Sequence, residues 1–406
     1  MVERQRAQSI PEPVTDPPSR AIEVQLPKSL RPYARTQLRW RPNCVVTVLR
    51  DGGETYPAML EAISSAQDSI CIETYILAAD RTGETFKAAL MERARAGIAV
   101  RLIYDAVGSF GLPGAWVDEL RAAGCQVIDF NPIAPWRRRV RFSHRDHRKI
   151  IVVDNAAAFT GGLNIANDYA AVADGGVGWH DMHCKVTGPI VLDLARMFRR
   201  TWMRAGGQYY KPPPPIGDAA PGHGASFVRL LDNTRRRQRA TIRRAYLHVI
   251  RTARDSVLIE NAYFLPDRGL RRALSNAVRR GVDVRIIVPG RSDVRLIEWA
   301  SLYALRSLVR QRVKILRWRG AMMHAKTAVV DATWSTIGSY NFDAMSRFNN
   351  LEVTVEILDT PTGASLIQNF ERDAANCDAF DLESWRNLPW WKKALAWFSF
   401  RLRRFL

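Results

Sequence analysis

The sequence predicts an α/β protein built from two similar halves, and three observations lead to that prediction. First, a chain of 406 residues can bury two hydrophobic cores, because single domains usually hold about 100–200 residues. Second, a strand–helix–strand pattern occurs at 69–105 and again at 256–289. Third, the same set of polar residues follows each pattern, at 147–164 and at 324–341. We therefore expect a duplicated fold with a mixed sheet in each half.

The start of the chain, residues 1–35, is predicted to be a loose tail. It is polar, interrupted by prolines and free of the apolar run that a secretory signal needs. Nowhere does an uninterrupted apolar stretch approach the roughly 18–20 residues that cross a bilayer. The five cysteines are scattered and show no metal-site spacing, so we expect them to be reduced. A cytoplasmic protein is the expectation.

The first half is predicted to span 36–208. Its repeat unit runs from Ser69 to Asp105 and reads SICIETYILAADRTGETFKAALMERARAGIAVRLIYD. A β-branched apolar run is followed by a loop, by a stretch of helical period that ends at Gly97, and by a second apolar run. This order predicts a βαβ unit.

The second half is predicted to span 226–384, and its unit has the same order of elements. From Ser256 to Pro289 it reads SVLIENAYFLPDRGLRRALSNAVRRGVDVRIIVP, with Gly281 in the place of the helix end. Between the halves, residues 209–225 are rich in proline and glycine, which join helices and sheets poorly. We expect this segment to be the linker.

The repeated polar set has the pattern HxKxxxxD, followed by a glycine, a small residue and an asparagine. Its members are His147, Lys149, Asp154, Gly161, Gly162 and Asn164 in the first copy, and His324, Lys326, Asp331, Gly338, Ser339 and Asn341 in the second. Residues two apart on a strand share a face, so each histidine and its lysine point the same way. Such a face can contact one phosphate.

This pattern suits phosphoester exchange. An imidazole can attack phosphorus or carry a proton near neutral pH, and a lysine neutralises the non-bridging oxygens. Exchange without a metal needs two such histidines, one as nucleophile and one as acid for the leaving alkoxide, and the duplication supplies them. One HxK alone usually marks a solvated strand edge, but two copies with matching flanks argue against a purely structural role. No metal or other cofactor is expected, because the lysines supply the positive charge.

The two complete motifs resemble the signature of the phospholipase D superfamily, over nearly the whole chain from about Arg50 to Asp378. Four further stretches look like bacterial cardiolipin synthases that lack amino-terminal transmembrane helices: NAYFLP from Asn261, SRFNNLEV from Ser346, WHDMHCKVTGP from Trp179 and RDHRK from Arg145. The resemblance implies two α/β domains related by a pseudo-twofold axis, with the active site at their interface.

The resemblance also implies roles for the motif residues. His147 would be the nucleophile, and His324 would be the general acid that later acts as base. The phosphate would be held by Lys149, Lys326, Asn164 and Asn341. The family places a carboxylate after each motif to orient a histidine; Glu352 fits the second copy, and Asp181 fills the place in the first, with a shorter side chain at a longer offset.

Four other residues in or near the motifs have more ordinary explanations. Asp154 and Asp331 complete the motifs, but they end apolar strands, and we expect them to stabilise the local structure rather than contact the phosphate. His144 and His183 lie near the motifs, where a histidine is more often a polar neighbour than a catalyst.

The implied reaction is transfer of a phosphatidyl group from one phosphatidylglycerol to another through a phosphohistidine, with release of glycerol. Two alternatives stay open. If water replaces the second lipid, the protein is a phospholipase D; and the formal charge of +20 would also suit a nuclease or another DNA-processing phosphodiesterase. We expect phospholipid rather than nucleic acid as the partner, and the sequence does not indicate an oligomeric state.

The carboxyl terminus, 385–406, is the feature that favours lipid, because it predicts a basic amphipathic helix. Its apolar stripe is Leu388, Trp391, Leu395, Phe398, Leu402 and Phe405. Aromatic residues flanked by cations are typical of a helix that lies on anionic lipid. The alternative is a helix packed on the protein's own core. A basic segment at Trp136–Arg141 could bind headgroups or DNA. We expect a peripheral protein on the cytoplasmic face of the bacterial membrane.

Overall fold

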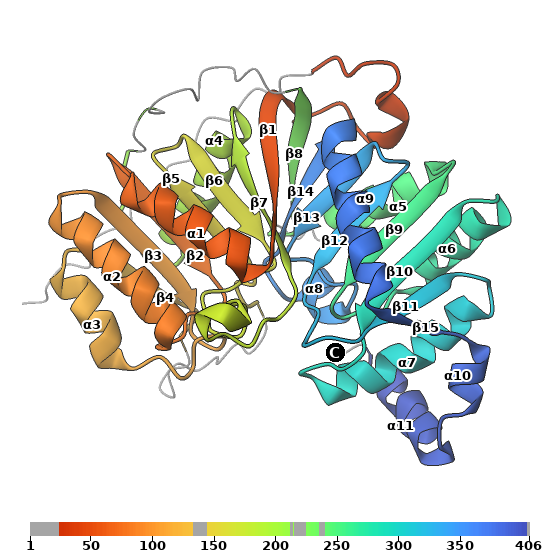
Figure 1. Ribbon diagram of the computed structural model, residues 1–406. Coiled ribbons are helices and arrows are strands. Elements are labelled where there is room, and N and C mark those ends of the chain that lie inside the picture. Colours follow the sequence, from red (N-terminus) through yellow and green to blue (C-terminus); the bar gives the residue numbers. More distant parts are fainter. Residues whose placement is uncertain (1–23, 133–143, 212–213, 215–224, 235–239, 404–406) are drawn as a thin grey trace, which may run out of the picture.

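The computed structural model describes residues 24–132, 144–211, 214, 225–234 and 240–403. Within these ranges the chain forms two similar α/β halves that stand side by side (Figure 1). Three predicted features lie wholly or mostly outside the described residues: most of the tail at 1–35, the basic segment Trp136–Arg141 and most of the linker at 209–225.

The strands of both halves join one fifteen-stranded mixed sheet. The first half contributes β1 (Arg41–Arg50), β2 (Ser69–Thr74), β3 (Ala99–Asp105), β4 (Gln126–Phe130), β5 (Ile150–Val153), β6 (Ala157–Gly161) and β7 (Met182–Thr187). The second contributes β8 (Ser226–Asp232), β9 (Ser256–Asn261), β10 (Asp283–Pro289), β11 (Lys314–Trp318), β12 (Lys326–Val330), β13 (Trp334–Gly338), β14 (Val353–Leu358) and β15 (Cys377–Phe380). The order is β15-β11-β10-β9-β12-β13-β14-β8-β1-β7-β6-β5-β2-β3-β4, and the antiparallel pair β1–β8 joins the halves.

The predicted βαβ repeat is confirmed. In the first half, α2 (Arg81–Arg95) connects the parallel strands β2 and β3; in the second, α6 (Arg268–Arg279) connects β9 and β10. Gly97 and Gly281 follow these helices with φ of 88° and 92°, a left-handed conformation that glycine adopts without a steric penalty. In both copies, therefore, a glycine in the left-handed conformation follows the helix.

Helices cover both faces of the sheet. They are α1 (Asp51–Ser64), α3 (Gly114–Ala122) and α4 (Ile190–Arg204) in the first half, and α5 (Thr241–Thr252), α7 (Arg295–Val309), α8 (Ala344–Phe348) and α9 (Thr360–Ala375) in the second. In Figure 1, α1 and α2 lie in front of the first half and α9 in front of the second. Buried side chains of α4 and α9 share one hydrophobic core with strands of both halves, so the halves are packed together.

The carboxyl-terminal region forms two helices, α10 (Leu382–Arg386) and α11 (Trp390–Arg401). The buried side of α11 is centred on Ala396, Ser399 and Phe400, and the Phe400 ring lies 4.9 Å from that of Tyr303 in α7. None of these three buried residues belongs to the predicted apolar stripe, and two members of that stripe, Trp391 and Phe398, are exposed. The opposite side exposes four aromatic residues: Trp390, Trp391, Trp397 and Phe398.

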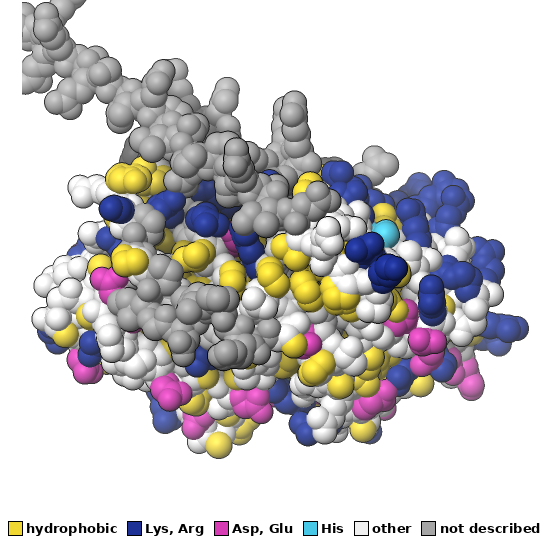
Figure 2. All heavy atoms as spheres, turned by 90° about the horizontal axis from the view of Figure 1, so that it is seen from above, with side chains coloured by type: hydrophobic (Ala, Val, Ile, Leu, Met, Phe, Trp, Pro, Cys, Tyr) yellow, Lys and Arg dark blue, Asp and Glu magenta, His cyan; other side chains and the backbone are white. Residues whose placement is uncertain are grey.

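Positive charge is concentrated on the second half. Figure 2 shows lysine and arginine side chains gathered at the right of the upper face, which is the side of the second half. Arginines of α5 and α6 contribute to this charge: Arg243, Arg244, Arg251, Arg268, Arg271, Arg272 and Arg279. No helix among the described residues is both long and apolar enough to span a membrane. All five cysteines are free, as expected.

Candidate active site

The two motif histidines lie two or three residues before equivalent strands on either side of the junction. His147 precedes β5, which pairs antiparallel with β2; His324 precedes β12, which pairs antiparallel with β9. Both side chains are buried, with 7% and 4% of the residue exposed. The lysine of each motif lowers the pKa of the histidine in the other half, so the two motifs share one electrostatic environment.

Each histidine is held by a carboxylate from the opposite half. The Nδ1 atom of His147 lies 3.1 Å from Oε2 of Glu352, and Nδ1 of His324 lies 2.8 Å from Oδ2 of Asp181. Both carboxylates are fully buried. A carboxylate at Nδ1 leaves Nε2 of each ring available for chemistry on phosphorus or for carrying a proton.

The backbone around the two pairs follows the same pattern. The N–H of His147 donates to the carbonyl of Leu351 at 3.0 Å, and the N–H of His324 donates to the carbonyl of His180 at 2.6 Å. Parallel bridges pair the residue before each histidine with the residue before each carboxylate. Asp181 and Glu352 are therefore structural equivalents, despite their different sequence offsets.

The residues after each motif fit these carboxylates. A Cβ atom at Gly162 would lie 2.1 Å from Oδ1 of Asp181, so only glycine leaves room for that carboxylate. The second copy has Ser339 instead, whose hydroxyl donates to Glu352. The second residue of each pair therefore fits the carboxylate beside it: Gly162 leaves room for Asp181, and Ser339 donates a hydrogen bond to Glu352.

Both motif lysines are buried beside the histidines. Lys149 donates to the carbonyl of His147 at 2.7 Å, and Lys326 donates to that of His324. Burial is the main cause that lowers the pKa of Lys149 to about 7 and that of Lys326 to about 8. A bound phosphate would offset this cost and favour the charged lysines.

The motif asparagines differ in their contacts. The amide of Asn164 donates to the Tyr169 hydroxyl at 2.7 Å, and its oxygen accepts from the N–H of Ile76 at 3.0 Å. The side-chain oxygen of Asn341 is buried without a hydrogen-bond partner among the described residues. An unsatisfied buried acceptor is costly, so the Asn341 oxygen is suited to accept a hydrogen bond from a donor group, such as a hydroxyl, of a ligand.

The motif aspartates bind backbone. Asp154 accepts from the N–H groups of Gln67, Asp68 and Ser69, at 2.8–2.9 Å. Asp331 repeats this arrangement with Arg254, Asp255 and Ser256, also at 2.8–2.9 Å. Each aspartate therefore ties the end of the motif strand to the start of β2 or β9.

Burial also shifts the pKa of the other ionisable groups. It lowers the pKa of His147, against the raising effect of Glu352. It lowers the pKa of His324 further, and Lys326 and Lys149 add to that shift. The pKa of Asp181 is raised to about 6 by burial. Both imidazoles are thus poised to be neutral until an anion enters the site.

Aromatic residues that the sequence reasoning missed surround the histidines. Tyr75 lies edge-on to His147 with ring centroids 5.0 Å apart, and Tyr263 and Trp179 lie 6.1 Å and 6.0 Å from His324. Tyr75 directly follows β2, and Tyr263 lies two residues after the end of β9, so an aromatic residue shortly after the first strand of each repeat was the available signal.

The nearby histidines have different surroundings. His183 is fully buried, and burial lowers its pKa to about 3, so it stays neutral. His144 lines a separate cavity beside Asp129 and Arg204. His180, which sequence reasoning passed over, bridges Asp51 at 2.6 Å and Asp373 at 3.0 Å.

Comparisons with known proteins agree with this geometry. A family model described as "Cardiolipin synthase, PLD-like domain" matches residues 59–202 and 246–374. The cardiolipin synthase of Geobacillus kaustophilus (strain HTA426) is 33% identical over 347 residues, which cover 84% of this chain and 68% of that protein. Cardiolipin synthase A of Pseudomonas fluorescens (strain SBW25) is 36% identical over 318 residues, covering 78% and 66%.

A solved structure supports the fold. The phosphatidylserine synthase of Haemophilus influenzae Rd KW20 superposes with a TM-score of 0.65 at 14% identity, covering 89% of this chain and 95% of that one. The family model and the cardiolipin synthase relatives confirm the resemblance inferred from the motifs. The chain belongs to the cardiolipin synthase family of proteins with phospholipase D-like domains.

Proposed function

We propose that the protein is a phosphatidyltransferase that makes cardiolipin from two molecules of phosphatidylglycerol. The observation that carries this proposal is a pair of buried histidines, each held at Nδ1 by a carboxylate of the opposite half and each beside a buried lysine. The protein's relatives that are named cardiolipin synthase support the choice of substrate.

In the first step, Nε2 of His147 attacks phosphorus. The bond from phosphorus to the glycerol oxygen breaks, and His324 gives its proton to that oxygen. The non-bridging oxygens are held by Lys149, Lys326 and Asn341. Their negative charge offsets the two lysine cations, which otherwise lower the pKa of His324, so that His324 can carry the proton. The step leaves a phosphatidyl group on His147 and a neutral His324.

In the second step, the hydroxyl of another phosphatidylglycerol attacks the phosphohistidine. His324 takes its proton, the phosphorus–nitrogen bond breaks, and cardiolipin leaves with both histidines restored. Transfer instead of hydrolysis requires that water be kept from the intermediate. The burial of both histidines, lysines and carboxylates supports that exclusion.

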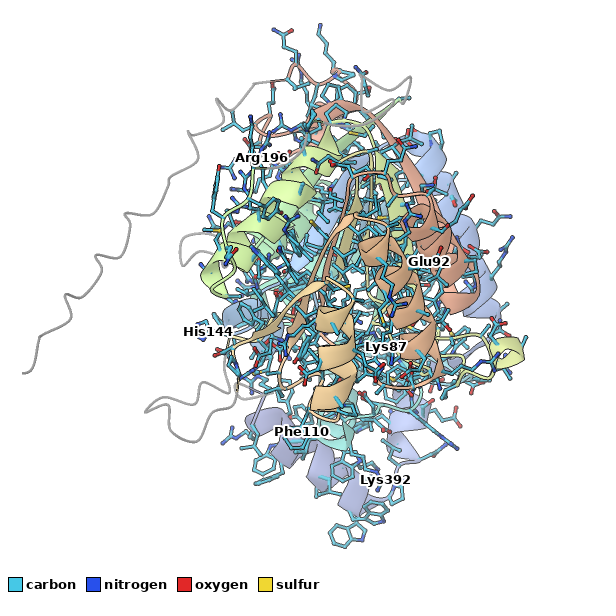
Figure 3. The ribbon with its side chains drawn as sticks, turned by 90° about the vertical axis from the view of Figure 1, so that its left-hand side faces the viewer. Lys87, Glu92, Phe110, His144, Arg196 and Lys392 are labelled. Atoms are coloured by element: carbon cyan, nitrogen blue, oxygen red, sulfur yellow. The ribbon has the colours of Figure 1, made fainter. Side chains whose placement is uncertain are left out.

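We further propose that the protein is peripheral on the cytoplasmic face of the membrane. The exposed aromatic side of α11 supports this, with Lys392, Lys393 and Arg401 close by. Phe110 of the first half, 83% exposed, lies at the same end of the molecule as Lys392 (Figure 3). Both halves could therefore contact one bilayer.

The test is product analysis by mass spectrometry after incubation with phosphatidylglycerol liposomes in EDTA. Cardiolipin and glycerol from the unmodified protein, but not from His147→Ala or His324→Ala, would support the transferase. Phosphatidic acid alone would make the protein a phospholipase D. Absence of lipid turnover together with cleavage of DNA would replace the proposal by a nuclease.

A further inference from the structure

A cavity of about 470 Å³ lies between the start of α6, the loop before α8 and the end of α11. Five arginines line it: Arg243, Arg268, Arg271, Arg347 and Arg403. Its other walls are largely apolar, with Leu265, Pro266, Phe342 and Phe348. We call it the arginine pocket.

The acidic residues of the arginine pocket do not balance its cations. Asp267 is already shared between Arg243 and Arg347, each with a nitrogen at 2.9 Å from one of its oxygens. The other carboxyl, Asp343, caps α8 through the N–H of Ser346, and burial raises its pKa to about 7. Asp343 is therefore only partly charged near neutral pH.

Three cations remain without a carboxylate. Arg268, Arg271 and Arg403 form no ion pair with any described residue. The pKa of Arg271 is lowered by burial and then by Arg403 and Arg268, which means that these charges repel one another. An anion in the pocket would relieve that repulsion.

Phe400 connects the arginine pocket with the terminal helix. The guanidinium carbons of Arg271 and Arg403 lie 5.5 Å and 4.2 Å from its ring centroid, so one buried ring supports both cations. Phe400 belongs to the inner side of α11, whose outer side carries the exposed tryptophans.

The arginine pocket is separate from the candidate active site. Tyr340 and Phe342 line it, while Asn341 between them belongs to the motif. None of the motif histidines or lysines contributes to its wall. A ligand held there would contact the back of the motif loop rather than the reacting phosphorus.

We propose that the arginine pocket binds the phosphate of an anionic glycerophospholipid, as an accessory lipid site beside α11. The three unpaired arginines hold the phosphate, and the apolar wall takes the start of the acyl chains. The choice of a membrane lipid over free phosphate rests on the proposed function. The positive charge of the pocket is independent of that proposal.

The test compares two arginines of the same helix. Arg271→Gln removes a pocket cation, and Arg272→Gln removes an exposed cation that does not line the pocket. Both are made in a His147→Ala background, so that turnover cannot change the lipid. Binding is measured by co-sedimentation with phosphatidylcholine vesicles with and without phosphatidylglycerol, and thermal denaturation checks folding.

We expect Arg271→Gln to bind the phosphatidylglycerol vesicles about fivefold more weakly than Arg272→Gln does. This factor corresponds to the roughly 1 kcal/mol that one cation contributes near an anionic surface. The double variant Arg268→Gln/Arg271→Gln should lose roughly a further fivefold. Vesicles of phosphatidylcholine alone should bind all variants equally.

Three results would overturn the inference. Equal losses from Arg271→Gln and Arg272→Gln would mean a general charge effect. Complete competition by millimolar inorganic phosphate would make the pocket a free-anion site, and a loss confined to duplex DNA binding would make it a nucleic-acid contact. The assay measures vesicle binding by protein that carries His147→Ala and is therefore inactive. Its result does not depend on turnover, so a failure of the transferase proposal can be distinguished from a failure of this inference.

Discussion

Replacement of one interfacial carboxylate should impair the histidine that it orients and leave the other histidine intact. Glu352→Gln keeps the shape of a fully buried side chain but removes the charge that faces Nδ1 of His147 at 3.1 Å. Asp181→Asn is the matched change at His324, at 2.8 Å. If His147 is the nucleophile and His324 the acid, the first change slows formation of the phosphohistidine and the second slows protonation of the leaving group.

The magnitude follows from the lost contact. A hydrogen bond to a charged group contributes about 1.5–3 kcal/mol. At about 1.36 kcal/mol per factor of ten, this corresponds to roughly 10- to 150-fold in rate. In the serine-protease triad, the equivalent exchange costs about 10⁴, because the amide also favours the wrong tautomer. We therefore expect losses of at least tenfold for each variant.

A substrate with an activated leaving group separates the two effects. Phosphatidyl-p-nitrophenol needs little protonation on departure, so it should restore most of the rate of Asp181→Asn and little of that of Glu352→Gln. The assay is rapid-quench trapping of the phosphohistidine, alongside release of p-nitrophenol. Equal restoration of both variants would refute the inference that each carboxylate acts on one histidine, and restoration of Glu352→Gln alone would reverse their roles.

Four other predictions concern the lysines, the buried ion pairs, the motif glycine and the terminal helix. Because the pKa of Lys149 is depressed to about 7 when folded, the buried charge destabilises the free protein fully below pH 7, and this cost disappears as pH rises toward the unfolded value of 10.5. Urea denaturation should therefore show Lys149→Met more stable than the unmodified protein at pH 6, with the difference shrinking by pH 10. His180 has a pKa raised to about 10 by Asp373 and Asp51 against the effect of burial, so its stabilisation is complete below pH 6.5 and is lost as pH rises through 10. His180→Leu, which copies the equivalent Leu351, should cost about 3–5 kcal/mol at pH 6 in the same assay and clearly less at pH 10.5; a pH-independent cost would contradict the ion-pair explanation. Gly162→Ala should reduce cardiolipin formation at least tenfold, because its Cβ would lie 2.1 Å from the Asp181 carboxylate; Gly111→Ala, where nothing lies within 4 Å, is the control and should leave the rate unchanged. Trp390→Ala should weaken vesicle binding on the order of tenfold, from the roughly 1.5–3 kcal/mol that burial of a large apolar side chain contributes, whereas Ala substitution of the surface residue Glu92 should have no such effect.

Features that repeat along the chain could be predicted from the sequence. The βαβ units at 69–105 and 256–289 are visible because their periodicity is local, and the two polar motifs are visible because every member recurs at the same offset. These two signals suffice for the fold class and for the family.

Features that depend on contacts between segments distant in the sequence could not be predicted. Glu352 and Asp181 were recognised as candidate orienting groups, but only the packed structure pairs each with the opposite half's histidine. The helix α11 shows the same limit, because its spacing allows several apolar faces and only contact with α7 selects the one through Phe400. The arginine pocket draws its cations from α5, α6, α8 and the residues just after α11, which no local pattern connects.

The crossed pairing of histidine and carboxylate has a consequence for ancestry. A single half carries a histidine whose orienting group it does not place, so an unduplicated ancestor would complete its site only as a symmetric homodimer. Fusion of two such subunits would then free the two pairs to diverge independently. The glycine with aspartate in one pair, and the serine with glutamate in the other, record that divergence. Complementary fragments, each inactive alone, should likewise assemble into one working centre.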